Sequence, residues 1–503
     1  MNRLDVLIAS LPPSYLNEPS IAPAVLKSAV EKHGFSCKTL DFSLHCLKFF
    51  FNQQYEPYLK WANTLPDHSD FSTVLNEHKI LLHQATDEFI KIINDTKPQY
   101  VALSVFSLWQ QRFAYFLCKK IKESNLRVKL IIGGMGCTSP PKGLFTVLSL
   151  SYFEKKNSYA SFMIAKKLAD FAIVNDGEIE LIRVLQDPDR YQNSLYSNET
   201  VFDHDYYPNF DDYKLDDYLF TNGEKKLLVQ GSKGCVRQCV FCSEHSNYSK
   251  FYFKSGNQIA NEIIALSQKY KIFKFQFTDS LVNGSLKEFK NFVKTLAQHN
   301  QASPDSQVRW HGNYICRAKN QMTDTDFQLM KLSGAHGLTI GAESGSNQVL
   351  AEMKKNTTAE DLLYEISKFH DHGIDCTLLF MIGFYSETWQ DFLLTLEFLK
   401  KLHKYFFSGT ISNIRLGYTL MFDDILDYSL EDFQYTPTQA YDWVYLKNPT
   451  LTLEERVKRR LIAQEFCDSL GIPVAYANED LSVLDAIYSN DSFVLRGSGI
   501  GTH

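Results

Sequence analysis

The chain has 503 residues, of which 44% are hydrophobic and 22% are charged. This length and composition are typical of a globular protein with about three domains. The net charge is −6 and no long basic block occurs, so nucleic acid is not favoured as a partner. No apolar run approaches the ~20 residues that cross a bilayer, and the first apolar run is too short for a signal peptide. We therefore expect a cytoplasmic protein without a membrane span.

Residues 1–190 alternate short apolar strands with helical stretches, which predicts a parallel sheet with helices on both faces. The expected fold class is a doubly wound, Rossmann-like α/β domain. Its strands are expected at 5–9, 36–40, 100–105, 129–133 and 171–174. Ligands of such sheets bind at the carboxyl ends of the strands, so the loops there are candidate ligand loops.

Residues 43–98 form a longer connection than this fold needs, and their apolar residues recur with helical periodicity. We expect the aromatic stripe of this insertion to pack against the sheet. The alternative is that the insertion roofs a substrate cavity. Residues 191–224 are rich in Asp, Asn and Tyr and break both periodicities, which predicts a surface linker.

Three cysteines with Cys-x3-Cys-x2-Cys spacing follow the run 225–230, which predicts that they lie on a loop leaving a strand. They are Cys235, Cys239 and Cys242. Three close thiolates bind a soft metal site well, and three ligands leave one iron of a cubane cluster without a protein ligand. The alternative is a structural zinc site that His245 closes as the fourth ligand.

Residues 225–424 repeat strands and amphipathic helical stretches, which predicts a partial (β/α)6 TIM-like barrel. The strands are expected at 226–230, 273–278, 308–316, 337–341, 374–382 and 412–421. The active face of such a barrel is the carboxyl end of its strands, where the cysteine loop also lies.

Polar residues follow successive strands of this barrel and are expected to converge on one cavity. Asp279 follows the second strand, Arg317 the third, and Glu343 and Ser344 the fourth. Asp279 could instead cap the helix that comes next. Glu343 at a buried strand end needs a charged or hydrogen-bonded partner, which favours a ligand.

Residues 425–503 contain no further barrel unit. We expect residues 425–470 to be helical, with aromatic residues that pack or close the open side of the barrel and a basic face that is solvated. That basic face consists of Arg456, Lys458, Arg459 and Arg460. The tail 496–503 is too rich in glycine to fold alone. It is either a disordered end or a segment that reaches back into the cavity.

The cysteine spacing, with Phe241 directly before the last cysteine, resembles the signature of the radical S-adenosylmethionine (SAM) superfamily. The resemblance implies a [4Fe-4S] cluster whose open iron chelates SAM and releases a 5′-deoxyadenosyl radical. The SAM contacts that it implies are Phe241, Asp279, Arg317, Glu343, Ser344, Ile382 and Gly383. One stretch departs from the family, which often has Gly-x-Pro-Gly-Glu-Thr after the fifth strand. Residues 383–388 here read Gly-Phe-Tyr-Ser-Glu-Thr and lack the proline and the second glycine.

The motifs at 11–13, 133–134 and 176–178 resemble the cobalamin-binding domain that precedes many radical SAM barrels. The cobalamin contacts that this resemblance implies are Pro12, Ser104, Gly133, Gly134, Gly177 and Glu178. The Asp-x-His-x-x-Gly motif that donates an axial histidine in other cobalamin proteins is absent, because Asp41 and His45 have the wrong spacing. We therefore expect no histidine from this domain on cobalt.

Together these features resemble the cobalamin-dependent radical SAM methylases over about residues 4–420. The resemblance implies that the deoxyadenosyl radical abstracts hydrogen from an unreactive carbon, which then takes a methyl group from methylcobalamin. A second SAM would remethylate the cobalt. The implied partners are a small-molecule or peptide substrate and an external electron donor of the flavodoxin or ferredoxin type.

Two other functions remain open. Some relatives use cobalamin for cyclisation or rearrangement without methyl transfer, and a non-catalytic cobalamin or redox sensor would keep its cluster as a structural element. A methylthiotransferase is not favoured because the amino-terminal domain lacks a second cysteine trio, and a peptide maturase is not favoured because no cysteine cluster follows the barrel. The sequence does not identify the substrate.

Overall fold

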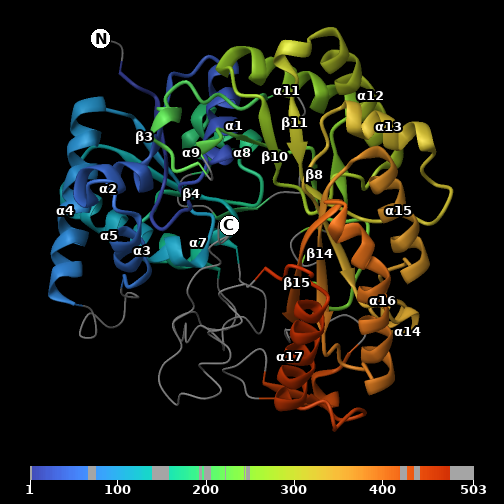
Figure 1. Cartoon of the computed structure of the whole chain (residues 1–503). Coiled ribbons are helices and arrows are strands. Elements are labelled where there is room, and N and C mark those ends of the chain that lie inside the picture. The colour runs from blue at the N-terminus through green and yellow to red at the C-terminus, as the bar shows by residue number, and fades with distance from the viewer. Residues whose placement is uncertain are drawn as a thin grey trace. The chain divides into compact units, whose positions relative to one another are not determined.

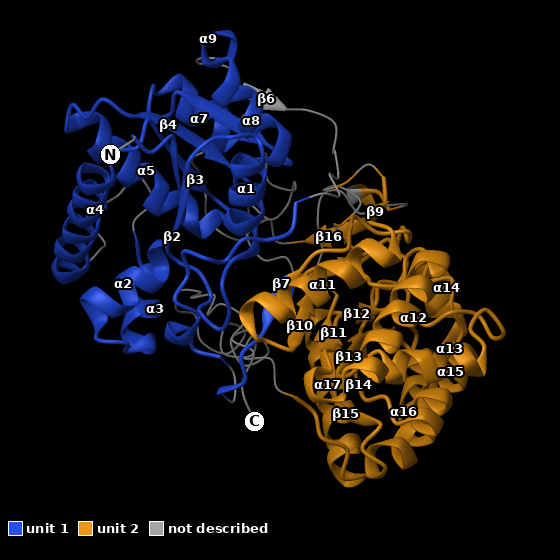
Figure 2. Cartoon of the chain, turned by 90° about the horizontal axis from the view of Figure 1, so that it is seen from above, with its two compact units in different colours: residues 1–140, 150–228 blue, residues 141–149, 229–503 orange. Residues whose placement is uncertain are grey.

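The computed structural model describes residues 3–65, 75–138, 158–191, 195–197, 206–220, 223–242, 244, 248, 250–419, 428–435 and 442–475. The chain divides into two compact units, and the division falls between Leu228 and Val229 (Figure 2). His245 and the tail 496–503, which both entered the sequence predictions, lie outside the described residues. Among the described helices, none combines the length and the apolar character that crossing a membrane requires.

The first unit is built on a six-stranded parallel sheet in the order β2-β1-β3-β4-β5-β6 (Figure 1). Its strands are β1 (Val6–Ser10), β2 (Cys37–Asp41), β3 (Tyr100–Ser104), β4 (Lys129–Gly133), β5 (Phe171–Val174) and β6 (Leu195–Ser197). The order reverses between β1 and β3, which confirms the doubly wound fold class. The first five strands lie within one residue of their predicted positions. β6 was not predicted, because it lies within the stretch expected to be a linker.

Helices cover both faces of this sheet. On one face, α1 (Ile21–Lys32) and α8 (Glu178–Gln186) join the strands in a single apolar core that includes Ile8, Val30 and Leu181. The other face carries α5 (Leu108–Glu123) together with the helices of the insertion (Figure 2). Short helices α7 (Tyr159–Ala165) and α9 (Pro188–Tyr191) complete the unit.

The insertion at 43–98 folds into three helices, α2 (Phe42–Phe51), α3 (Tyr55–Asn63) and α4 (Asn76–Thr96). The Phe42 ring lies 4.8 Å from the Phe89 ring of α4 and 5.7 Å from the Phe113 ring of α5, measured between centroids. Leu47 and Tyr58 are fully buried. The interpretation of the aromatic stripe as core packing is therefore confirmed for the described part of the insertion.

The segment 206–220 packs on the first unit by burying aromatic side chains. Phe210 is fully buried, and the hydroxyl of the buried Tyr218 donates to Asp41 at 2.9 Å. The Asp212 carboxylate accepts from the Thr39 amide at 2.8 Å. These contacts fix this part of the chain beside β2.

Two parallel sheets, in the orders β11-β10-β7 and β12-β13-β14-β15, form the barrel, and all of their strands except the first two residues of β7 belong to the second unit. The strands are β7 (Leu227–Val229), β10 (Lys274–Phe277), β11 (Arg309–His311), β12 (Asn313–Tyr314), β13 (Leu338–Glu343), β14 (Cys376–Ile382) and β15 (Ile411–Tyr418). All six predicted barrel strands are present, and the third is divided at Gly312 into β11 and β12. This arrangement confirms the partial barrel.

The outer layer of the barrel consists of helices that follow its strands (Figure 1). They are α11 (Gly256–Tyr270), α12 (Leu286–Ala302), α13 (Asp324–Leu332), α14 (Asn347–Glu352), α15 (Ala359–His372) and α16 (Trp389–Phe407). Four of them begin with a capping box, in which the side chain of a Ser or Thr accepts from the third helical residue, and that residue's side chain accepts from the cap backbone. The pairs are Ser255/Gln258, Thr323/Asp326, Thr358/Asp361 and Thr388/Asp391. The sequence therefore encodes the helix starts locally.

The carboxyl-terminal segment differs from the prediction that residues 425–470 are helical. It contains helix α17 (Leu453–Ser469), but β16 (Phe433–Tyr435) and β17 (Trp443–Tyr445) form an antiparallel hairpin before it. The hairpin forms because Phe433, Trp443 and Tyr445 are buried in one apolar cluster of the second unit. After α17, Val474 pairs with Ile414 on the free edge of β15.

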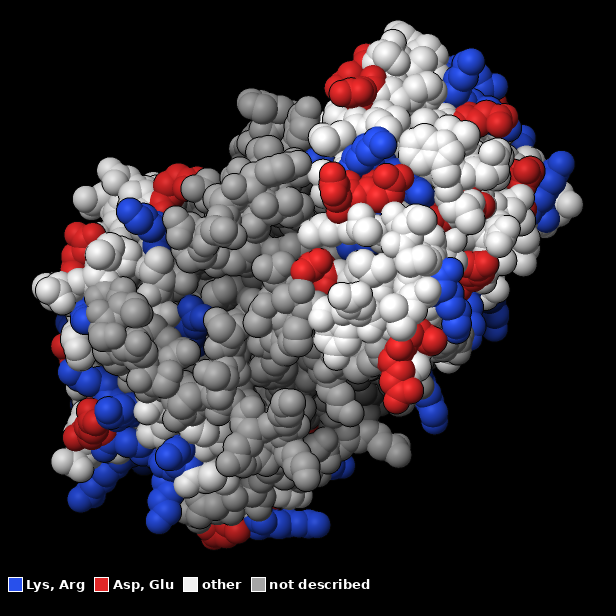
Figure 3. All heavy atoms as spheres, turned by 90° about the horizontal axis from the view of Figure 1, so that it is seen from below, with Lys and Arg blue, Asp and Glu red and all other residues white. Residues whose placement is uncertain are grey.

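The basic face expected on α17 is not solvated, which corrects that prediction. Arg456 has 0% of its surface exposed, Arg459 4% and Arg460 3%, whereas Lys458 is exposed. Each buried guanidinium meets acceptors or an aromatic ring of the barrel or of the carboxyl-terminal segment, which is what makes its burial possible. On the face shown in Figure 3, acidic and basic side chains both occur among the described residues.

Candidate functional site

The cysteine loop leaves a short hairpin at the carboxyl end of β7. The hairpin pairs β8 (Ser232–Lys233) with β9 (Tyr252–Phe253). The loop starts at Gly234, whose φ is +78° and where a Cβ atom would lie 2.7 Å from the Lys250 carbonyl oxygen. This position therefore requires glycine. The loop is also tied to the end of α14, because the Val240 amide donates to the Met353 carbonyl at 3.2 Å.

The three thiols share one electrostatic environment. Cys239 is buried, and Cys235 and Cys242 are partly buried. Burial raises the pKa of all three thiols, that of Cys239 to about 11, and the other cysteines of the trio add to the increase at Cys239. The positive charge of Lys355 acts in the opposite direction on each of them. The fold has thus brought the trio together beside a buried cation.

This donor set fits an iron–sulfur cluster better than a single metal ion. Among the described residues, no three Cys, His, Asp or Glu side chains are grouped so that they could hold one ion. A cubane cluster does not need that grouping, because each thiolate binds a different iron. The zinc alternative needs His245, which lies outside the described residues.

Lys355 is a site residue that the sequence predictions missed. Its Nζ lies 2.7 Å from Oε1 of Glu343, and the two side chains are 12% and 11% exposed. Glu343 has a φ of +61°, at an irregularity where the register of β13 shifts against β14. At Gly341 a Cβ atom would come within 2.6 Å of the Lys355 Nζ and nearer still to Glu343 Oε1. The charged partner expected for Glu343 is therefore present within the chain.

Ser344 also has partners within the barrel. Its Oγ lies 3.1 Å from Oγ1 of Thr395 on α16 and accepts from the Ser346 amide at 3.1 Å. Ser344 is 1% exposed. The Gly-x-Glu-Ser-Gly-Ser run is thus held rigidly at the end of β13.

Asp279 connects the end of β10 to the start of the cysteine loop. Its carboxylate accepts from the Gly231 amide at 2.9 Å and from the Ser232 hydroxyl at 2.5 Å. Burial raises the pKa of Asp279 to about 7. Ser285, not Asp279, caps α12 by accepting from the Glu288 amide. The helix-cap interpretation of Asp279 is therefore wrong.

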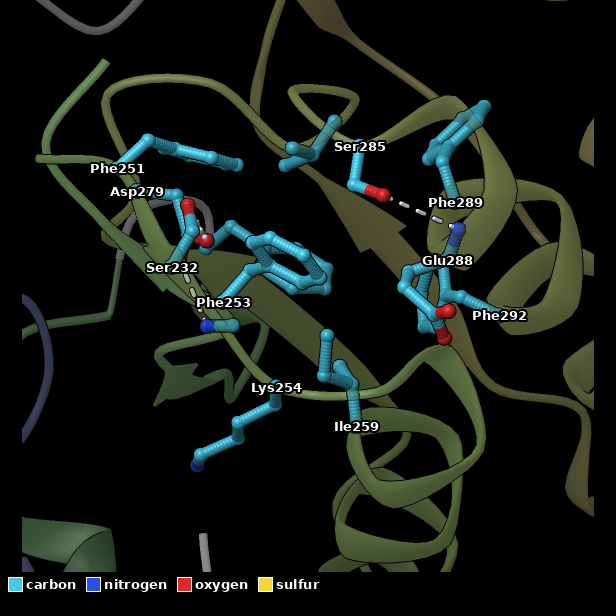
Figure 4. Close-up of a pocket in the computed structure, with 13 residues that line it drawn as sticks. Ser232, Phe251, Phe253, Lys254, Ile259, Asp279, Ser285, Glu288, Phe289 and Phe292 are labelled. Carbon is cyan, nitrogen blue, oxygen red and sulfur yellow. Dashed lines mark hydrogen bonds between the residues drawn. The ribbon is translucent and has the colours of Figure 1, made fainter. Parts of the chain in front are cut away.

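A small pocket opens beside Asp279 (Figure 4). It is small and partly open to solvent, and five phenylalanines contribute to its wall. The aromatic residues are Phe251, Phe253, Phe277, Phe289 and Phe292. Lys254 at its edge is already paired with Glu262 at 2.7 Å. The pocket is therefore lined in part by Ser232 and Phe253 of the β8–β9 hairpin, and two carboxylates, those of Asp279 and Glu288, line it as well.

Arg317 folds back onto the loop that follows β10. Its Nη2 donates to the Asn283 carbonyl and, at 2.9 Å, to the Gly284 carbonyl. Burial and the nearby Arg237 lower the pKa of Arg317 from its usual value. Arg317 thus fixes a neighbouring loop, and its expected contact with SAM stays a prediction.

The end of β14 carries the remaining predicted residues of this unit. Ile382 is fully buried, and Phe241 packs against the apolar cluster that contains Phe384. Gly383 has a φ of +76°, and a Cβ atom there would lie 2.5 Å from Cγ of Arg456. The structure therefore requires glycine at residue 383.

In the first unit, hydrogen bonds and close backbone packing connect the candidate ligand loops after β1, β3 and β4. The side-chain amide of Gln110, another residue that the sequence predictions missed, donates to Leu11 at 2.8 Å and to Pro13 at 3.1 Å. At Gly134, with φ +108°, a Cβ atom would lie 2.7 Å from the Val105 carbonyl oxygen.

The six predicted cobalamin contacts belong to four neighbouring strands. Pro12 follows β1, Ser104 ends β3, Gly133 and Gly134 end and follow β4, and Gly177 and Glu178 start α8 after β5. Because β1, β3, β4 and β5 are adjacent and parallel, these residues lie along one edge of the sheet. The φ of Gly177 is −98°, so its backbone does not require glycine.

Comparisons with known proteins agree with this architecture. Residues 229–399 match the family model of the radical SAM superfamily. An uncharacterized methyltransferase of Pyrococcus horikoshii is 24% identical over 66% of this chain and 72% of its own length. Cytidylyl-2-hydroxyethylphosphonate methyltransferase of Streptomyces wedmorensis is 24% identical over 59% of this chain, and the match spans only 60% of that enzyme.

One solved structure extends the similarity to most of the chain. The radical SAM methyltransferase TsrM of Kitasatospora setae, solved with cobalamin and a [4Fe-4S] cluster bound, superposes with a TM-score of 0.54. The superposition covers 86% of this chain and 77% of TsrM at 15% sequence identity. At that identity the similarity concerns the fold: a doubly wound domain followed by a partial barrel.

Proposed function

We propose that this chain, whose residues 229–399 match the radical SAM family model, cleaves SAM with a [4Fe-4S] cluster and transfers a methyl group, via cobalamin, to an unactivated carbon of its substrate. The observation that carries the proposal is the cysteine trio on the loop after β7, beside the buried pair of Lys355 and Glu343. When bound, the cluster supplies the electron that cleaves SAM, and cobalamin supplies a methyl carrier.

The residues of the second unit have distinct roles in this proposal. Cys235, Cys239 and Cys242 hold the cluster, and the ammonium of Lys355 offsets part of the charge of the three thiolates. Glu343 uses one carboxylate oxygen for Lys355 and keeps the other for a polar group of SAM.

The remaining predicted SAM contacts are proposed on the same grounds. Phe241, Ile382 and Gly383 provide an apolar wall for the adenine, because they adjoin one buried cluster at the carboxyl end of β14. Asp279, Arg317 and Ser344 place polar groups at neighbouring strand ends. Their internal hydrogen bonds support a preorganised pocket, which needs little rearrangement to bind its ligand.

We propose that cobalamin binds at the edge of the first sheet. Pro12, Ser104, Gly133, Gly134, Gly177 and Glu178 are the proposed contacts. The glycine after β4 keeps side-chain atoms away from the loop backbone there, which suits close approach of a large ligand. None of the six residues is a histidine, so none of them would offer an imidazole to a bound cobalamin.

A partner is needed to deliver electrons, and we propose a flavodoxin or a ferredoxin in the cytoplasm. The compartment is supported by the cysteines, because all ten are free thiols and thiols persist in a reducing environment. The proposed substrate is a small molecule or a peptide.

The test is product analysis with anaerobically reconstituted protein that contains iron, sulfide and hydroxocobalamin. With SAM and titanium(III) citrate, we expect two products: 5′-deoxyadenosine from reductive cleavage and S-adenosylhomocysteine from methyl donation. Cys239→Ala should abolish 5′-deoxyadenosine, whereas Cys467→Ala, at a buried cysteine of α17, should not. Only 5′-deoxyadenosine would overturn methyl transfer in favour of cyclisation or rearrangement, and neither product would overturn the enzymatic proposal.

A further inference from the structure

The segment 383–388 joins β14 to α16 and is the stretch that departs from the usual family sequence. Phe384 and Tyr385 are fully buried there, and so is Glu387. Backbone groups in a buried turn require hydrogen-bond partners. Without the proline and the second glycine, the turn depends on partners from elsewhere in the chain.

Those partners come from the carboxyl-terminal segment, outside the matched residues 229–399. The side-chain amide of Asn448 donates to the Tyr385 carbonyl at 3.2 Å and to the Glu387 carbonyl at 3.1 Å. Nη1 of Arg459 donates to the carbonyls of Glu387 and Thr388, both at 3.1 Å. Two side chains therefore donate hydrogen bonds to three carbonyls of this turn.

Arg459 also reaches the strand end through an ion pair. Its Nη1 lies 3.0 Å from Oε1 of Glu387, and the same oxygen accepts from the Gly383 amide at 3.2 Å. The two charged side chains are 5% and 0% exposed. A buried, hydrogen-bonded ion pair of this kind fixes geometry strongly, because breaking it leaves a charge without compensation.

Arg456 supports the same strand end from one turn away on α17. Its guanidinium lies 3.6 Å above the Trp443 ring, and its Nη1 donates to the Trp443 and Leu451 carbonyls, each at 2.8 Å. These bonds hold its methylene groups against Gly383, where no Cβ atom would fit. The backbone at residue 383 therefore has little room to shift.

We propose that Asn448, Arg456 and Arg459, here called the C-terminal clamp, are positioning residues that set the SAM-binding turn at Ile382 and Gly383. This inference rests on the proposed function, because it assumes that this turn contacts SAM. It makes the segment after the matched domain a part of the SAM pocket and gives the buried arginines of α17 a role beyond packing.

The test compares SAM binding by the cluster-reconstituted full chain with binding by Arg459→Gln. We expect the Kd for SAM, measured by calorimetry well below the unfolding temperature, to rise about tenfold. The iron content should stay at the wild-type level, because the Arg459 side chain forms its hydrogen bonds with Glu387, Thr388 and Glu455. Lys458→Gln, on the exposed side of the same turn of α17, is the matched control and should bind SAM like the wild type.

Asn448→Ala is the second variant, because it removes the two neutral hydrogen bonds that Asn448 donates to the turn and keeps the buried ion pair. We expect it to weaken SAM binding about threefold. SAM should change the electron paramagnetic resonance spectrum of the reduced cluster, and this change should become smaller in both variants in proportion to their loss of SAM affinity. A purely structural role of the clamp would not produce that correlation.

The outcomes separate this inference from the proposed function. If the wild type itself fails to bind SAM, the proposed function falls. If the wild type binds SAM and Arg459→Gln binds equally tightly, the C-terminal clamp is only structural and this inference falls. A lower unfolding temperature with an unchanged Kd would likewise overturn it.

Discussion

The ion pair of Glu343 and Lys355 predicts a specific pattern of stability. Lys355→Met leaves the Glu343 carboxylate nearly buried without its cation, and we expect a loss of about 3 kcal/mol in the free energy of unfolding. Adding Glu343→Gln should recover part of that loss, because the remaining group is neutral. Urea unfolding of the apoprotein measures both effects.

Lys354→Met is the control for this pair, because Lys354 is the exposed neighbour in the sequence. It should leave the urea midpoint within experimental error of the wild type. Equal effects of the two lysine substitutions would contradict the assignment of Lys355 as the charged partner of Glu343.

Gly134 offers a test, at a single residue, of how tightly the loops after β3 and β4 pack together. In Gly134→Ala the new Cβ atom meets the Val105 carbonyl at 2.7 Å in a backbone with φ +108°. We expect the first unit to lose about 2 kcal/mol or more, because backbone strain and a clash with the main chain add.

Gly34→Ala provides the comparison, because Gly34 has φ +82° but nothing within 4 Å of its ideal Cβ position. Gly34→Ala should lower the free energy of unfolding by about 1 kcal/mol, because only the unfavourable positive φ of the alanine contributes. Thermal unfolding of both variants measures the difference. If the Gly34 variant were as unstable as the Gly134 variant, the positive φ alone would explain the loss of stability, and the close contact between the two loops would contribute nothing.

At the scale of secondary structure, helix α15 carries a buried acid that makes stability depend on pH. Glu365 is 1% exposed, and burial raises its pKa to about 8 from an ordinary value of 4.5. The folded state therefore holds a proton that the unfolded state releases between those two values. The stabilisation from this group is complete below pH 4.5 and is lost as the pH rises through 8.

The prediction is that stability falls with rising pH in this window, with a contribution from Glu365 that approaches about 1.4 kcal/mol per pH unit. Glu365→Gln should remove that contribution and give a flatter profile. Urea midpoints from pH 5 to pH 8 test it. An unchanged slope in the variant would show that Glu365 is already ionised in the folded protein.

The regular elements could be predicted from sequence because their signals are local. Short runs that are apolar, or that alternate apolar and polar residues as in β2, place β1 to β5 between turn signals, and the capping boxes place the starts of four barrel helices. The hairpin β16–β17 was missed because its aromatic residues suit a helix face as well as a strand. Only their burial in one cluster of the barrel decides between the two.

The basic face of α17 shows how a local rule can fail. Arginines were expected in solvent, yet Arg456, Arg459 and Arg460 share the spacing of the buried Ala463 and Cys467 on the same helix. That helical spacing was the available signal, and the charge concealed it. Burial becomes possible only because the turn at 383–388 and the aromatic hairpin supply acceptors and ring faces.

The residues of the candidate site also fall into two groups, those that the sequence predicts and those that it does not. The cysteine trio and the residues at strand ends follow from short motifs and barrel topology, so the sequence places them at one end of the second unit. The contacts of Gln110, Asn448 and Asp279 do not follow, because they join segments far apart in the chain. Lys355 lies 12 residues from Glu343, but no short motif pairs the two. Such contacts are decided by tertiary packing and leave no local pattern.

At the scale of the whole molecule, the proposed function needs both compact units. In that proposal the matched residues 229–399 would hold the cluster and SAM, and the doubly wound domain of the first unit would hold cobalamin. TsrM, solved with both cofactors, has a similar fold over 86% of this chain. The central claim is therefore that one chain holds two metal cofactors in two separate units.

The most direct measurement is the iron, cobalt and zinc content of the chain after anaerobic purification, reconstitution with iron, sulfide and hydroxocobalamin, and desalting. We predict about four iron and one cobalt per chain, with Cys239→Ala losing the iron and keeping the cobalt. Iron without cobalt would contradict the cobalamin part of the account. Stoichiometric zinc that resists exchange, held by the cysteine loop, would contradict the radical SAM chemistry itself.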